Sequence, residues 1–167
     1  MFCTLILFMI EKEIVDLVKP LYSEKDSMHN FKHILRIKKR VNLYKKDYKK
    51  IDENKLLFLI YFHGLKEYVK KNKNMIIGIG FPKNYLDALY RHTKKPITIE
   101  EKLVSDANLW EAVGDFGIKK AFQVGKERNQ TVNQTIKIMQ NNVKKVKKKL
   151  LKKLSRSLKN LFLKMVS

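Results

Sequence analysis

The fold is decided by one stretch of the sequence, Leu56-Leu57-Phe58-Leu59-Ile60-Tyr61-Phe62-His63-Gly64. Its first seven residues are apolar without interruption, which fits either a buried strand or a buried helix. Asp52 and Glu53 precede the run, and acidic residues suit the positive N-terminal end of a helix. No turn signals typical of a β-hairpin flank it. We therefore predict a central helix that is apolar on all sides, with His63 at its end.

Helical spacing continues towards the N-terminus. Apolar residues recur every three or four positions from Ile10 to Leu21, and Pro20 is expected to end that helix. The same spacing returns from Phe31 to Tyr48, with Ser27 as the expected N-cap. Most of the lysines in this second helix fall off the apolar stripe, whereas His33 lies beside it.

Helical signals also follow the central run. Pro82 is suited to open a helix over residues 83–92, because proline needs no N–H at that position. Thr98 and Glu101 have the spacing of a capping box at the start of the next helix. The chain shows neither internal repeats nor alternating strand pairs. The sequence therefore predicts an all-α bundle of about six to seven helices with a basic amphipathic helix at its C-terminus.

The formal charge of +21 is extreme for 167 residues, and it is unevenly spread. Residues 129–167 contain eleven Lys or Arg and no acidic residue. Such a segment attracts nucleic acid or an anionic membrane surface, and non-specific nucleic-acid binding is one expected role. The alternatives are a helix docked on the bundle through its apolar stripe and a merely solubilising charge.

The N-terminus gives no sign of export. The apolar residues before Ile10 are too few to span a bilayer and lack the positive start of a signal peptide. We interpret residues 1–9 as an extension ahead of a start at Met9, or else as an apolar cap on the first helix. Cys3 is the single cysteine, so no internal disulfide can form. We expect a cytoplasmic protein without a transmembrane segment.

Histidine and aspartate residues are distributed in a way that suits a metal site built from several helices. His33, His63 and Asp106 fall on three different expected helices. A neutral imidazole binds transition metals, and a carboxylate supplies negative charge. Ligands that converge from separate helices leave open positions for water and phosphate. A histidine taken alone is more often an ordinary core or surface residue, so the prediction depends on the whole pattern.

That pattern resembles the HD-domain family of metal-dependent phosphohydrolases, in which a histidine is followed by a His-Asp pair and a distant aspartate. The matching pieces are His33 in His-x-x-Arg-Ile with His29 four residues before it, His63, His92 after the Pro82 helix, Asp106-Ala107-Asn108-Leu109, and Gly114-x-x-Gly117-Ile118. The resemblance covers about residues 24–125. It implies an HD-type helical domain over residues 10–128, followed by the basic segment 129–167.

The resemblance also implies roles for single residues. The metal ligands would be His33, His63 and Asp106, holding one divalent ion of Mn, Fe, Co, Ni or Zn. Substrate would be bound by His29, Arg36 and His92, with Lys66 as a further phosphate contact. Asp106 and Glu67 would be catalytic, Glu67 as a general base. For Lys66 and Glu67, ordinary surface charge is the favoured interpretation. The substrate would be a small phosphorylated molecule such as a nucleotide.

Gly64 departs from the family pattern, because it stands where the pair's aspartate is expected. A glycine offers no ligand, so a two-metal mechanism is not expected. The sequence leaves two alternatives open: a weakened metal-dependent phosphohydrolase, or a catalytically inactive HD-fold protein that binds an anionic ligand or nucleic acid.

Overall fold

The computed structural model describes the backbone of residues 2–153 and the side chains of residues 9–144. Every regular element in that part of the chain is helical, with nine α-helices, one short 3-10 helix and no strand. The predicted all-α fold is confirmed. Two short helices that were not predicted, α4 (Lys66–Lys71) and α5 (Lys73–Gly78), follow the central run and raise the number of helices. No helix among the described residues is both long and apolar enough to cross a bilayer.

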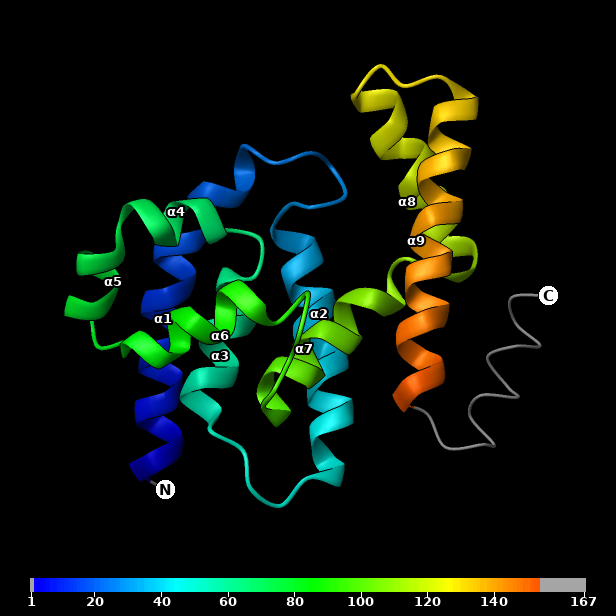
Figure 1. Ribbon diagram of the computed structural model, residues 1–167. Coiled ribbons are helices and arrows are strands. Elements are labelled where there is room, and N and C mark those ends of the chain that lie inside the picture. The colour runs from blue at the N-terminus through cyan, green and yellow to red at the C-terminus, as the bar shows by residue number, and fades with distance from the viewer. Residues whose placement is uncertain (1, 154–167) are drawn as a thin grey trace. The chain divides into compact units, whose positions relative to one another are not determined.

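Contacts divide the chain into two units, residues 1–107 and 108–167. The first unit contains α1 (Phe2–Ser23), α2 (Phe31–Tyr44), the 3-10 helix (Lys45–Asp47), α3 (Glu53–Phe62), α4, α5, α6 (Lys83–Arg91) and most of α7 (Ile99–Trp110). The second contains α8 (Gly114–Glu127) and α9 (Val132–Lys153). Figure 1 shows the helices of each unit.

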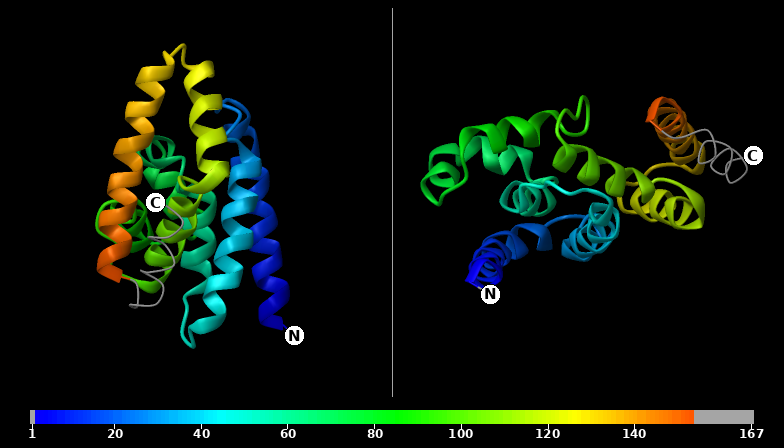
Figure 2. Two further views of the ribbon diagram at one scale, coloured as in Figure 1. Left: turned by 90° about the vertical axis from the view of Figure 1, so that its right-hand side faces the viewer. Right: turned by 90° about the horizontal axis from the view of Figure 1, so that it is seen from below.

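Helix α3 is the central helix of the first unit, as predicted. It packs on α1, α2 and α6 and lies between them (Figures 1 and 2). Residues 55–62 are all buried, because neighbouring helices cover every side of α3. Phe58 packs its ring against Phe81, with centroids 4.8 Å apart and the ring planes tilted by 42°. The Asp52 side chain caps the helix by accepting the Lys55 N–H at 3.0 Å.

Three predicted helix boundaries are wrong, the first being the end of α2, which lies at Tyr44 and not at Tyr48. Helix α1 continues past Pro20 to Ser23, because a proline in the last turn removes a single backbone hydrogen bond and does not prevent the helix from closing. The N-cap of α2 is Asn30 and not Ser27, since the Asn30 side chain accepts the Lys32 N–H at 3.0 Å. The Ser27 carbonyl instead accepts a hydrogen bond from the Asn30 side-chain amide.

The start of α7 is held by Glu101, whose side chain is fully buried. Its carboxylate accepts hydrogen bonds from Arg91 Nη2 at 2.6 Å, Arg91 Nε at 3.0 Å and the Ile97 N–H at 3.0 Å. Thr98 Oγ1 donates to the same carboxylate at 3.3 Å, so Thr98 and Glu101 interact through their side chains, whereas the backbone N–H that Glu101 accepts is that of Ile97 and not that of Thr98. This ion pair ties the end of α6 to α7.

In the second unit, α8 and α9 form a hairpin and run side by side in both figures. The chain reverses at Asn129, which has a positive φ of 54°. The predicted basic segment begins at this turn and forms α9. Its apolar stripe from Val146 to Met165 lies outside the described side chains, so its docking stays a prediction.

Helices α8 and α9 approach most closely at Gly125. A Cβ atom there would lie 2.3 Å from Thr135 Oγ1, and Thr135 is buried. We expect Gly125→Ala to lower the free energy of unfolding by about 1 kcal/mol, because overpacking outweighs the helix propensity that alanine adds. Gly78→Ala is the matched control, since a Cβ at Gly78 meets nothing within 4 Å. Urea denaturation tests this, and a Gly125→Ala variant at least as stable as Gly78→Ala would contradict the close approach.

Candidate functional site

The four histidines of the chain lie in one row within the first unit. His29 precedes α2, His33 is in its first turn, and His63 and His92 are the C-caps of α3 and α6. Ring centroids are 5.7 Å apart for His29 and His33, 5.1 Å for His33 and His63, and 6.4 Å for His63 and His92. His29 is partly exposed, whereas the other three rings are buried. His29 and His92 thus belong to one cluster, although they are 63 positions apart in sequence.

Helix ends orient two of these rings in the same way. His63 Nδ1 lies 2.9 Å from the Ile60 carbonyl, and His92 Nδ1 lies 2.6 Å from the Leu89 carbonyl. A carbonyl only accepts, so each Nδ1 carries the hydrogen and each neutral ring keeps its lone pair on Nε2. The same backbone contact is common behind metal-binding histidines, where it fixes the tautomer and the direction of the ring.

His33 and His63 point their Nε2 atoms at each other, 3.1 Å apart. Since His63 Nε2 carries a lone pair, His33 Nε2 donates in this contact. Two imidazole nitrogens that share one zinc ion at about 2.0–2.1 Å are separated by about 2.9–3.4 Å for angles from a right angle to tetrahedral. At this spacing the two nitrogens could share an ion only after His33 Nε2 gave up the hydrogen that it donates here.

The predicted carboxylate ligand is less well supported by the structure than the two histidines. Within the residues that the structure describes, no three His, Cys, Asp or Glu side chains form a group that could hold a metal ion. Asp106 is partly buried on α7. The pKa of the Tyr44 hydroxyl is raised, first by burial and also by the negative charge of Asp106, while the positive charge of Arg40 lowers it. The two imidazoles are donors of the kind that a transition metal binds. Among the described residues they are not part of a group of three ligands.

Tyr22 occupies the space beside Gly64. A Cβ atom at Gly64 would lie 3.0 Å from Tyr22 Oη and 3.1 Å from Tyr22 Cε1. The hydroxyl donates to the Tyr61 carbonyl at 2.9 Å and accepts the Gly64 N–H at 3.3 Å. Burial raises the Tyr22 pKa, and the Gly64 N–H only partly offsets this effect. The backbone at Gly64 has no positive φ, so it is the tyrosine that demands a glycine here.

The basic residues predicted to meet phosphate flank the histidine row. Lys66 Nζ donates to Thr93 Oγ1 at 2.9 Å, which holds this cation next to the residue that follows His92. Arg36 is partly buried one turn beyond His33, a spacing that places both on one face of α2. At the outer end, His29 Nδ1 pairs with Asp26 Oδ1 at 2.7 Å. Lys66 is thus fixed by a partner rather than being a freely solvated surface charge.

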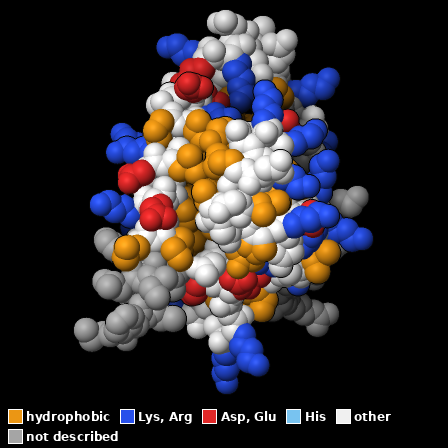
Figure 3. All heavy atoms as spheres, turned by 90° about the vertical axis from the view of Figure 1, so that its left-hand side faces the viewer, with side chains coloured by type: hydrophobic (Ala, Val, Ile, Leu, Met, Phe, Trp, Pro, Cys, Tyr) orange, Lys and Arg blue, Asp and Glu red, His pale blue; other side chains and the backbone are white. Residues whose placement is uncertain are grey.

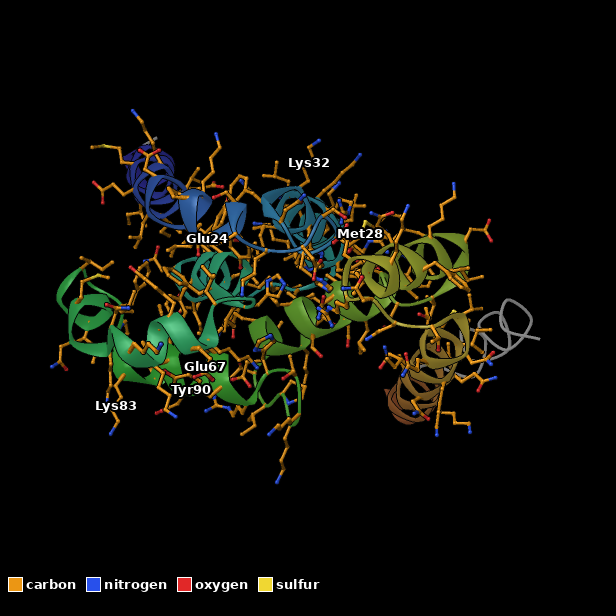
Figure 4. All side chains as sticks on the ribbon, turned by 90° about the horizontal axis from the view of Figure 1, so that it is seen from above. Glu24, Met28, Lys32, Glu67, Lys83 and Tyr90 are labelled. Carbon is orange, nitrogen blue, oxygen red and sulfur yellow. The ribbon has the colours of Figure 1, made fainter. Side chains whose placement is uncertain are left out.

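Glu67 follows Lys66 and lies on the exposed surface of α4. Figure 4 shows Glu67 next to Tyr90 of α6, whereas Met28 and Lys32 lie on the opposite side of the unit. The pKa of Tyr90 is raised by burial and then by the charges of Glu67 and Asp87. These are the surroundings of a solvated helix residue.

Two residues of the site carry no signal in the sequence. Tyr22 is one of several apolar positions on α1, and its contact with Gly64 spans 42 residues. Thr93 is a polar residue after a helix, and its bond to Lys66 spans 27 residues. Neither contact has a local pattern, because each arises only when separate helices pack.

No protein-family model matches the chain, and no curated protein matches it. Among solved structures, it is similar to the crystal structure of the Lin1889 protein from Listeria innocua. The TM-score is 0.61 and the sequence identity is 22%, over 93% of this chain and 88% of that chain. At this identity the likeness shows a shared fold and nothing about activity.

Proposed function

We propose that this chain is an HD-type metal-dependent phosphohydrolase with a reduced metal centre, acting on a small phosphorylated molecule such as a nucleotide. The observation that supports the proposal most strongly is the pair of buried Nε2 atoms of His33 and His63, 3.1 Å apart. Their helices are far apart in sequence, and the Ile60 carbonyl holds His63 in the tautomer that a metal needs.

One divalent transition metal (Mn, Fe, Co, Ni or Zn) would be held by His33 and His63, with Asp106 as the proposed carboxylate ligand. Such an ion, when bound, neutralises charge on phosphate oxygens and lowers the pKa of a bound water. One ion is proposed and not two, because Gly64 supplies no bridging carboxylate and Tyr22 fills the space beside it. Water or a phosphate oxygen would complete the coordination.

The chain's own residues would bind and orient the phosphate. Lys66 is held by Thr93 beside the histidine row, and Arg36 lies on the His33 face of α2. Both cations attract a dianionic phosphate, and Arg36 can bind two of its oxygens at once. His29 and His92 stand at the two ends of the row and would set how far a ligand extends along it.

His63→Gln is expected to lower metal affinity at least tenfold, because the variant loses one of two imidazole donors from a site with few other ligands. Metal content of the untreated protein and calorimetric titration with Mn²⁺, Co²⁺, Ni²⁺ and Zn²⁺ measure this. His29→Ala is the control, since His29 is partly exposed and its Nδ1 contacts Asp26.

The same samples test hydrolysis. A phosphoester panel with each added metal should show turnover by the wild type and none by His63→Gln or Asp106→Asn. If the wild type binds no metal and hydrolyses none of the phosphoesters in the panel, the proposal fails.

A second candidate function is phosphate-ligand binding without hydrolysis, and the contact between Tyr22 and Gly64 favours it. Gly64 supplies no carboxylate, and Tyr22 crowds the first atom that any side chain at position 64 would add. Thermal stabilisation by nucleotides in the presence of a chelator, together with a silent hydrolysis panel, supports this candidate. Robust hydrolysis by the wild type excludes it.

A further inference from the structure

Three apolar side chains of one short segment are exposed on the first unit, away from the histidines in sequence. Met75, Ile77 and Ile79 expose 38%, 39% and 52% of their surfaces. Three large apolar side chains within five residues are more than the scattered exposure normal for a surface. We call Met75, Ile77 and Ile79 the α5 tip.

The α5 tip is held outward by its neighbours in sequence. Ile76 is fully buried and Phe81 nearly so, and both belong to the hydrophobic core. Gly80, with a φ of +103°, lets the chain turn back towards Phe81. With these two residues anchored, the side chains of the tip cannot turn inward.

The backbone N–H groups at the end of the tip have partners. The N–H groups of Ile79 and Gly80 donate to the carbonyls of Met75 and Ile77 at 3.0 Å each, and the Phe81 N–H donates to the Ile76 carbonyl at 3.3 Å. A segment with paired N–H groups enters an apolar phase without the cost of unpaired donors.

Exposed positive charge surrounds the tip. Residues 70–83 contain Lys70, Lys71, Lys73 and Lys83 and no acidic residue, and all four lysines are exposed. Figure 3 looks onto the side of the molecule where α5 lies, and apolar side chains gather there with Lys and Arg, and some Asp and Glu, around them.

We propose that residues 70–83 dock on an anionic lipid surface, with the α5 tip inserted at the boundary of headgroups and acyl chains. Lysines near an anionic surface each attract it, and their flexible stems let the ammonium groups stay among the headgroups. Apolar burial adds to this attraction. A nucleic acid would use the lysines but leaves three exposed apolar side chains without a role. The lipid surface accounts for both features.

The test is co-sedimentation of the full chain with vesicles of phosphatidylcholine alone and of phosphatidylcholine mixed with phosphatidylserine, at physiological ionic strength. The wild type should bind the mixed vesicles and not the neutral ones. Ile79→Asp should weaken binding about tenfold, through lost apolar burial and added repulsion. Ile97→Asp is the matched control, because Ile97 is 61% exposed and the charge change is identical.

The basic segment 129–167 is unchanged in both variants, so a difference in vesicle binding between them cannot come from that segment. Three outcomes overturn the proposal: no binding to mixed vesicles, equal binding to neutral vesicles, and equal loss in Ile79→Asp and Ile97→Asp. A chain that binds a single-stranded oligonucleotide but neither kind of vesicle also overturns it. Brominated lipid should quench the tryptophan fluorescence added by Ile79→Trp but not that added by Ile97→Trp.

Discussion

Gly64→Asp is expected to lower the stability of the chain and to leave phosphoester hydrolysis no higher than in the wild type. The new Cβ atom would lie 3.0 Å from Tyr22 Oη and 3.1 Å from Tyr22 Cε1. Tyr22 cannot move aside easily, because it is buried and hydrogen-bonded to the Tyr61 carbonyl. Overpacking of this kind costs about 1–3 kcal/mol, and Tyr22 crowds the first atom of the new side chain.

A second variant makes this expectation sharper. Tyr22→Ala with Gly64→Asp removes the ring and opens space for the carboxylate. If metal binding and hydrolysis increase in the double variant and not in Gly64→Asp, the two positions are coupled as the contact predicts. Urea denaturation, metal titration and the phosphoester panel are the measurements. Strong hydrolysis in Gly64→Asp alone would contradict the account of Tyr22.

Glu101→Gln is expected to lower the free energy of unfolding by about 3 kcal/mol, since it breaks a buried ion pair and leaves Arg91 without its partner. The Arg91 side chain keeps 33% exposure, which lets water recover part of its charge and places the cost at the low end of that range. Glu24→Gln, at an exposed glutamate, should change stability by less than about 0.5 kcal/mol.

The same glutamate makes stability depend on pH. Burial raises the pKa of Glu101, but hydrogen bonds from Arg91 and the Ile97 N–H and the charges of Arg91 and Lys55 outweigh it, so the net pKa is lowered. A lowered folded pKa contributes stability above the ordinary carboxyl pKa of about 4.3, and this is lost as the pH falls through the folded value. Unfolding curves of wild type and Glu101→Gln should therefore converge in acid. Equal stability at neutral pH would contradict a structural role for the pair.

The central helix and the histidine-bearing helix ends could be predicted because their signals are local. Seven uninterrupted apolar residues behind Asp52 specify a buried helix, and Pro82 specifies the start of the helix that ends at His92. The cap of α2 could not be chosen in the same way. Ser27 and Asn30 are both good N-caps, and the position at which α2 packs decides between them.

The state of the site could not be predicted from local patterns. Gly64 looked like a missing ligand, whereas its meaning depends on Tyr22, which comes from another helix. The bond from Lys66 to Thr93 likewise arises only from packing, and the role of Lys66 towards phosphate stays a prediction. The role of Asp106 stays a prediction, because among the described residues no group of three His, Cys, Asp or Glu side chains that could hold a metal ion is formed.

The most direct measurement is a Co²⁺ titration followed through the histidine side chains by NMR. All four histidines of the chain lie in the row, so every imidazole signal reports on the candidate site. The account predicts saturation at one equivalent, with the signals of His33 and His63 affected first and most strongly. No saturable change at His33 and His63, or a change confined to the partly exposed His29, would contradict it.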